Sequence, residues 1–102
     1  MYIQTVIFSL HPDVPDEAFL PLAAELHDWL RRQPGFASYA LYRGQGEWMD
    51  QIFWLSEPEA QEANRRFNAS TLAPRLLALV DSHHHGFSGS CTDLSEWLKP
   101  PV

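Results

Sequence analysis

The chain has 102 residues, and thirteen acidic against seven basic side chains give it a formal net charge of −6 at pH 7. Hydrophobic residues make up 45% of the sequence and charged residues 20%, which is typical of a folded domain rather than a disordered segment. The negative charge argues against a nucleic-acid or anionic-membrane partner, and no apolar run approaches the ~20 residues that cross a bilayer.

The length suits one domain, which we place at residues 1–91, followed by a C-terminal tail at 92–102. Cys91 is the only cysteine, so no disulfide can form within the chain, and a reducing compartment is expected. The first ten residues lack the basic and long apolar regions of a secretory signal. We therefore expect a cytoplasmic protein.

The first half of the chain predicts a strand, a helix and a β-hairpin. Tyr2–Phe8 is rich in β-branched and aromatic residues, which favour a strand. Apolar residues at helical spacing then predict a helix from about Asp16 to Arg32. Strands over 36–43 and 48–56 follow, and Gly44 and Gly46 supply a turn that pairs them antiparallel.

The second half predicts two helices and a last strand. A helix begins near Ser56 with Pro58 in its first turn, and a break follows at 68–70. The apolar stripe of a second, short helix consists of Leu72, Leu76, Leu77, Leu79 and Val80. His83–Cys91 contains no helix signal and is predicted as a strand. This order predicts an α+β, ferredoxin-like fold, the split βαβ arrangement with a four-stranded antiparallel sheet and helices on one face.

The apolar strands indicate that a second chain covers the sheet. Tyr2–Phe8, Phe36–Tyr42 and Ile52–Leu55 show no clean polar face. A strand with two apolar faces needs cover on both sides, and the helices of so short a chain can cover only one. We therefore expect a homodimer that forms through the free face of the sheet.

Local motifs strengthen this expectation. Gln33-Pro34-Gly35-Phe36 precedes Ser38–Arg43, and Trp54-Leu55-Ser56 precedes a helix that opens with Glu59-Ala60. This pattern resembles the antibiotic-biosynthesis-monooxygenase type of dimeric α/β barrel, over nearly the whole chain up to Cys91. The resemblance implies that two sheets, one from each subunit, form a barrel, and that a small organic substrate or heme binds between the sheet and helices of each subunit.

The same resemblance bears on cofactors. Heme-degrading relatives use an Asn on the first strand, a Trp near the second helix and a His toward the end of the helical segment. Here Gln4 stands on the first strand, and Ser70–Leu77 contains no His. We therefore do not expect heme. Other relatives oxygenate a phenol or quinol whose deprotonated form reacts with oxygen, which implies no cofactor and no metal.

Seven residues are candidates for a site. Gln4, Tyr39, Arg43, Trp54 and Asn64 would bind the ligand, and His83 and His85 would be catalytic. Strand alternation places Tyr39 with Arg43 on one face, and His83 with His85 on one face. Gln4 can equally be satisfied by a hydrogen bond across the sheet, and Trp54 can equally be a core residue.

The run His83–His85 has three interpretations. It can be a solvated strand end, it can supply an acid–base group with an ordinary pKa near ~6.5, or it can bind a metal. A metal site needs more than two ligands, and Asp81 is the nearest carboxylate in the sequence.

Two functions remain open. We favour a monooxygenase-like protein that acts on a small aromatic or polyketide-like compound without a cofactor, in which His83 or His85 accepts a proton. The alternative is a non-catalytic dimeric module for ligand binding or stress response, in which the same cavity holds a hydrophobic molecule and no bond is broken.

Overall fold

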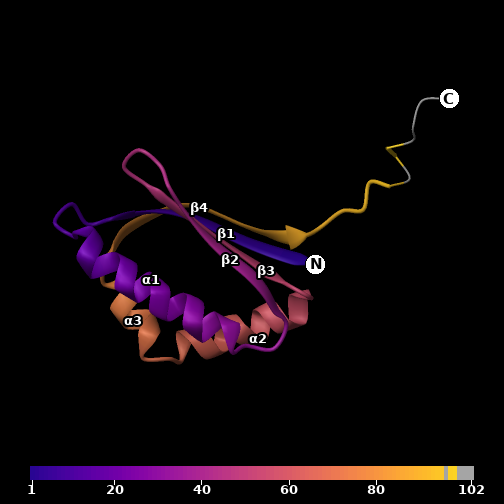
Figure 1. The fold of residues 1–102 in the computed structure, drawn as a ribbon, viewed down its shortest axis with the longest axis horizontal. Coiled ribbons are helices and arrows are strands. Elements are labelled where there is room, and N and C mark those ends of the chain that lie inside the picture. Colours follow the sequence, from indigo (N-terminus) through magenta and orange to yellow (C-terminus); the bar gives the residue numbers. More distant parts are fainter. Residues whose placement is uncertain (96, 99–102) are drawn as a thin grey trace.

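The protein forms a four-stranded sheet and three helices in a computed structural model that describes residues 1–95, 97 and 98 (Figure 1). In chain order the elements are β1 (Tyr2–Leu10), α1 (Asp16–Arg31), β2 (Phe36–Arg43), β3 (Trp48–Trp54), α2 (Glu57–Asn68), α3 (Leu72–Leu77) and β4 (Val80–Ser90). This is the predicted order, and it confirms the α+β, ferredoxin-like fold.

The strand order is β2-β3-β1-β4, and all neighbouring strands are antiparallel. The three helices lie on one face of the sheet and leave the other uncovered (Figure 1). In the register, Val6 on β1 lies opposite Asp50 on β3 and opposite Gly86 on β4. Since alternate residues of a strand face the same side, this pairing fixes which side chains meet the helices.

The core lies between the sheet and the helices. Its buried residues are Phe8, Phe19, Ala23, Leu26, Leu30, Trp54, Ala60, Ala63, Leu72 and Leu76. They recur at helical spacing in α1, α2 and α3, so each helix turns one apolar stripe toward the sheet. Trp54 is 0% exposed and is the largest fully buried side chain. Its ring packs edge-on against Phe36.

The structure corrects one boundary between a helix and a strand. Leu79 and Val80 were predicted in the last helix, but α3 ends at Leu77 and β4 begins at Val80, which pairs with Leu10. A backbone hydrogen bond from His11 N–H to the Leu79 carbonyl closes this corner. The apolar periodicity continues across the boundary because the helix and the strand bury residues in the same core, so periodicity alone cannot separate them.

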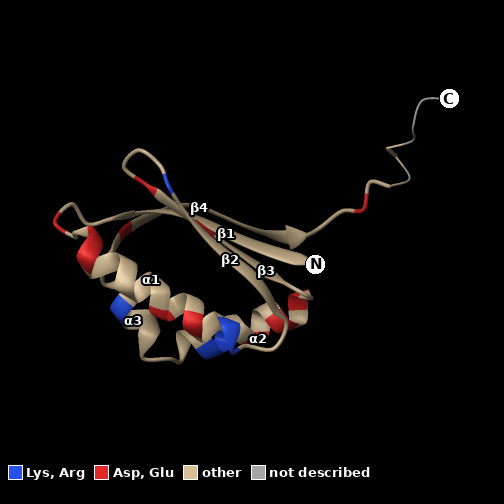
Figure 2. Ribbon diagram, in the orientation of Figure 1, with Lys and Arg blue, Asp and Glu red and all other residues tan. Residues whose placement is uncertain are grey.

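Charged side chains lie mainly on the helices and loops, and the strands are almost free of them (Figure 2). The uncovered face carries apolar residues from three strands: Ile3, Ile7, Met49, Phe53 and Phe87. Beyond β4, residues 92–95, 97 and 98 run away from the domain (Figure 1). Within the described residues, no helix is both long and apolar enough to cross a membrane.

Candidate functional site

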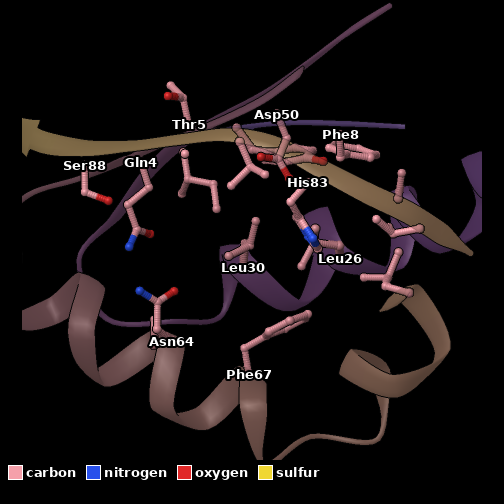
Figure 3. Close-up of a pocket in the computed structure, with 18 of the residues that line it drawn as sticks. Gln4, Thr5, Phe8, Leu26, Leu30, Asp50, Asn64, Phe67, His83 and Ser88 are labelled. Atoms are coloured by element: carbon pink, nitrogen blue, oxygen red, sulfur yellow. The ribbon is translucent and has the colours of Figure 1, made fainter. Parts of the chain in front are cut away.

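A cavity of about 390 Å³ lies between the sheet and the helices (Figure 3). Its walls are mainly apolar, with Phe8, Phe19, Leu26, Leu30 and Phe67 among the lining residues. Small-molecule sites typically have volumes of ~300–1,000 Å³ and combine such walls with a few polar groups. The cavity therefore has the size and character of a site for a small, largely apolar compound.

Most polar groups of the cavity come from the sheet. Gln4, Tyr39, Asp50, His83 and Ser88 are supplied by the four strands, and Asn64 by α2. Gln4 and Asn64 extend toward each other from opposite sides of the cavity, whereas Thr5 is directed away from it (Figure 3). Of the seven predicted site residues, five therefore line the cavity: Gln4, Tyr39, Trp54, Asn64 and His83.

A hydrogen bond fixes the orientation of the Gln4 amide. The indole Nε1–H of Trp54 donates to Gln4 Oε1 at 2.8 Å. Because an indole can only donate, the amide oxygen must face Trp54, and the NH₂ group is left as a donor. Gln4 thus has both of the roles left open by the sequence: its oxygen is satisfied across the sheet, and its NH₂ group belongs to the cavity.

A β-bulge separates the histidines. His85 pairs with Ile7 and His83 pairs with Phe8, so His84 is an extra residue in β4. Ile7 and Phe8 point to opposite faces of the sheet, and so do their partners. His83 lines the cavity, whereas His84 forms a 2.6 Å hydrogen bond between its Nε2 and Ser9 Oγ. The prediction that His83 and His85 share a face is therefore wrong, because strict alternation does not hold across a bulge.

Arg43 does not reach the cavity. Its guanidinium forms an ion pair with Asp16 at 2.7 Å and lies 4.3 Å from the ring centroid of Trp48. It shares the cavity-facing side of β2 with Tyr39, as alternation predicted, but it stands at the end of the strand beside the hairpin. The prediction that Arg43 binds the ligand is not supported, since local partners already hold its side chain.

Tyr39 is held in its protonated form. Burial raises the pKa of its hydroxyl above the ordinary value, and the charge of Asp50 raises it further. The His27 ring packs at 5.5 Å from the Tyr39 ring on the side of α1. At neutral pH, Tyr39 can therefore donate a hydrogen bond, but it cannot act as a base.

Asp50 was not among the site residues predicted from the sequence. This residue lines the cavity from the middle of β3, and burial raises the pKa of its carboxyl to about 6, although a hydrogen bond with the Val6 backbone lowers it in part. A charge in the middle of the otherwise uncharged run Trp48–Trp54 was the available signal. A buried carboxyl with a raised pKa in a cavity is a recognised mark of a functional group.

The described residues contain no group of three or more His, Cys, Asp or Glu side chains that could hold a metal ion. Asp81, the carboxylate nearest to the histidine run in the sequence, lies instead 3.3 Å from His11 Nδ1. No combination of these side chains therefore supports the metal-binding interpretation of the histidine run.

Solved structures share this architecture. SnoaB, a cofactor-independent oxygenase from Streptomyces nogalater, matches with a TM-score of 0.77 and 18% identity over 90% of this chain and 93% of its own. The chain has the fold of the antibiotic biosynthesis monooxygenases. One monooxygenase of this kind matches with a TM-score of 0.62 and 21% identity, covering 87% of this chain and 94% of its own.

Rv0793 from Mycobacterium tuberculosis has the same fold, with a TM-score of 0.70 and 19% identity over 92% of this chain and 97% of its own. Neither the models of protein families nor the curated proteins give a match. The predicted resemblance to the monooxygenases is thus confirmed at the level of the fold.

Proposed function

We propose that this protein is a cofactor-independent monooxygenase that acts on a small aromatic or polyketide-like compound in the cavity. The observation that carries the proposal is the cavity itself, with apolar walls and polar groups at a few positions. The fold shared with SnoaB, which is a cofactor-independent oxygenase, gives further support.

Each part of the cavity has a role in this reaction. The apolar walls hold the flat ring system, and the amides of Gln4 and Asn64 donate to a substrate oxygen as negative charge develops on it. His83 is both exposed and part of the wall, so it can move a proton between the cavity and water. In the net reaction, a CH₂ group next to the aromatic system and O₂ give a carbonyl group and water, so the substrate supplies all four electrons.

Oxygen uptake tests the proposal. With anthrone-like or quinol substrates, the wild-type protein should consume oxygen, and His83→Ala should slow the turnover by about 10²-fold, the lower end for loss of an acid–base group. His85→Ala is the matched control, since His85 lies on the other face of the same strand, and it should keep the wild-type rate. Equal rates for both variants would exclude the role of His83.

The alternative is a non-catalytic module for ligand binding or stress response. The largely apolar wall favours it, because such a wall retains a hydrophobic molecule without any reaction. Saturable binding of the same substrates without oxygen uptake would support this alternative and contradict the oxygenase.

The proposal includes a homodimer that forms through the uncovered face of the sheet. Support comes from the apolar side chains on that face and from the absence of any charged residue in β1. The proposed setting is the cytoplasm, where the lone Cys91 would stay reduced.

A further inference from the structure

Asp50 brings an acidic group into an otherwise uncharged cavity. Among the described residues that line the cavity, it is the only Asp or Glu, and none is Lys or Arg. It stands in the middle of β3, between Leu41 of β2 and Val6 of β1 in the register. Neither of these neighbouring side chains can compensate a negative charge, so the protein stabilises the carboxylate only in part, through a hydrogen bond with the Val6 backbone.

The carboxylate has spare capacity as a hydrogen-bond acceptor. An ionised carboxylate offers about four acceptor positions, and the Val6 backbone occupies one of them. None of the ion pairs among the described residues involves Asp50. In the same part of the chain, every side-chain oxygen that is sealed from solvent has a hydrogen-bond partner. The unused positions of Asp50 therefore open toward the cavity.

A glycine leaves room in the same row across the sheet as this carboxylate, one strand beyond Val6. Gly86 lies opposite Val6 on the side away from Asp50, so the three residues form one row across the sheet. A Cβ atom at Gly86 would meet nothing closer than the Thr5 carbonyl oxygen, at 3.8 Å. The row thus presents an acceptor at one side and open space at the other, and the edge of a flat ligand can enter there.

Few titratable groups face Asp50 from the surrounding elements. Tyr39 faces it from β2 and His83 from β4, and both Asp50 and His83 extend from the sheet toward the cavity (Figure 3). The residues that β1, α1, α2 and α3 contribute to the cavity wall include no titratable side chain. Among the described residues that line the cavity, His83 is therefore the only side chain that could place a positive charge near Asp50.

We propose that Asp50 is the proton acceptor of this cavity and that it selects neutral ligands that carry an acidic hydroxyl group. This inference rests on the proposed function and deepens it. The O–H bond of the ligand breaks, the proton joins an Asp50 oxygen, and the electron pair stays on the ligand as a phenolate or enolate. An anionic ligand is disfavoured, because it would place a second negative charge beside Asp50 in a site without Lys or Arg.

Binding measurements test the selectivity without any turnover. Wild-type protein at pH 8 should bind 1-naphthol at least tenfold more tightly than 1-methoxynaphthalene or 1-naphthoate, because only the naphthol can donate a hydrogen bond to the carboxylate. Asp50→Asn keeps an acceptor oxygen but loses the charge, so it should weaken the preference over the ether and remove the discrimination against 1-naphthoate. The matched control is Asp81→Asn, which makes the same charge change at an exposed residue paired with His11, and it should keep the preference. Equal binding of all three compounds by the wild type would overturn the proposal.

The pH profile of turnover tests the proton transfer itself. The kcat/KM for a quinol should rise with pH through an apparent pKa near 6, the value of the Asp50 carboxyl. Asp50→Asn should lower kcat/KM by at least 10²-fold and remove this step in the pH profile. The His83→Ala variant should retain the step. Persistence of the step in Asp50→Asn would overturn the role of Asp50. If no substrate is oxidised by the wild type, the oxygenase proposal fails, while the naphthol experiment still decides the role of Asp50 in binding.

Discussion

At the scale of the residue, Asp50 and Gln4 show how the same strand environment treats two polar side chains. Gln4 is neutral and shares its oxygen with Trp54. Asp50 carries a charge without a cationic partner, so burial opposes its ionisation and its pKa rises. A side chain that lowers the stability of the fold and faces a cavity is expected where function, rather than folding, requires it.

The buried charge of Asp50 should destabilise the fold, and this effect should appear in the pH dependence of the free energy of unfolding. The pKa of Asp50 is about 6 in the folded protein against an ordinary value of 3.8. Between these two values the folded state binds more protons than the unfolded state, so the free energy of unfolding falls as pH rises through this window. Two pKa units correspond to up to about 3 kcal/mol at pH 8. Asp50→Asn should therefore be more stable than wild type at pH 8 by up to this amount, and equally stable at pH 4.

Urea unfolding at fixed protein concentration, at pH 4, 6 and 8, measures this difference. Asp81→Asn is again the control, because its carboxylate is exposed and lies 3.3 Å from His11, and it should not gain stability at pH 8. If Asp50→Asn is less stable than wild type at pH 8, the Asp50 charge does not destabilise the fold. The argument that this charge is retained for a role in the cavity would then fail.

At the scale of the element, β4 combines the bulge at His84 with the open position at Gly86. Gly86→Ala should be tolerated, since its Cβ meets only the Thr5 oxygen at 3.8 Å, and Ala in a strand is favoured over Gly by about 0.5–1 kcal/mol. Gly86→Leu should instead fill the open space that lies on the other side of Val6 from Asp50. We expect at least a tenfold loss of naphthol affinity with little change in thermal stability. Undiminished affinity in the Leu variant would show that the ligand does not enter beside Gly86.

The sequence predicts the elements well because the apolar periodicity that marks each one also forms the core. Ala60, Ala63 and Phe67, for example, mark one face of α2 in the sequence and pack in the core of the structure. The site is predicted less completely. Gln4, Asn64 and His83 were found as polar residues at the right positions, but His85 was assigned to the wrong face, because an added strand residue leaves no local sequence signal.

Asp50 and Arg43 show a second reason why the site is predicted less completely than the fold. The role of Asp50 depends on which strand face is covered, and that depends on the register with β1, a long-range property. Arg43 was expected in the cavity from alternation alone, but its ion pair with Asp16 depends on how the start of α1 lies against the hairpin. Charged residues in strands are thus the ones whose environment a single sequence leaves least determined.

At the scale of the whole molecule, the two faces of the sheet differ: the helices cover one face and enclose the cavity, and the other face is uncovered. The outer face presents half-buried Ile3, Ile7, Met49 and Phe53, and the side chain of Phe87 there is 56% exposed. Exposed apolar surfaces of this kind mark interaction sites, and a symmetric homodimer is the commonest assembly. A second copy would bury this face without covering the helices.

The assembly prediction is a dimer at micromolar concentration. Light scattering coupled to gel filtration should give twice the 11.7 kDa mass of the chain, and the midpoint of thermal unfolding should rise with protein concentration, because association stabilises the folded state by mass action. Phe53→Glu, which puts a charge on the outer face of β3, should give a folded monomer. Leu20→Glu is the matched control, since Leu20 lies on α1 and is 42% exposed, and it should remain dimeric. A wild-type monomer would mean that this apolar face is stable in water, and the barrel expected from two sheets would then have no basis.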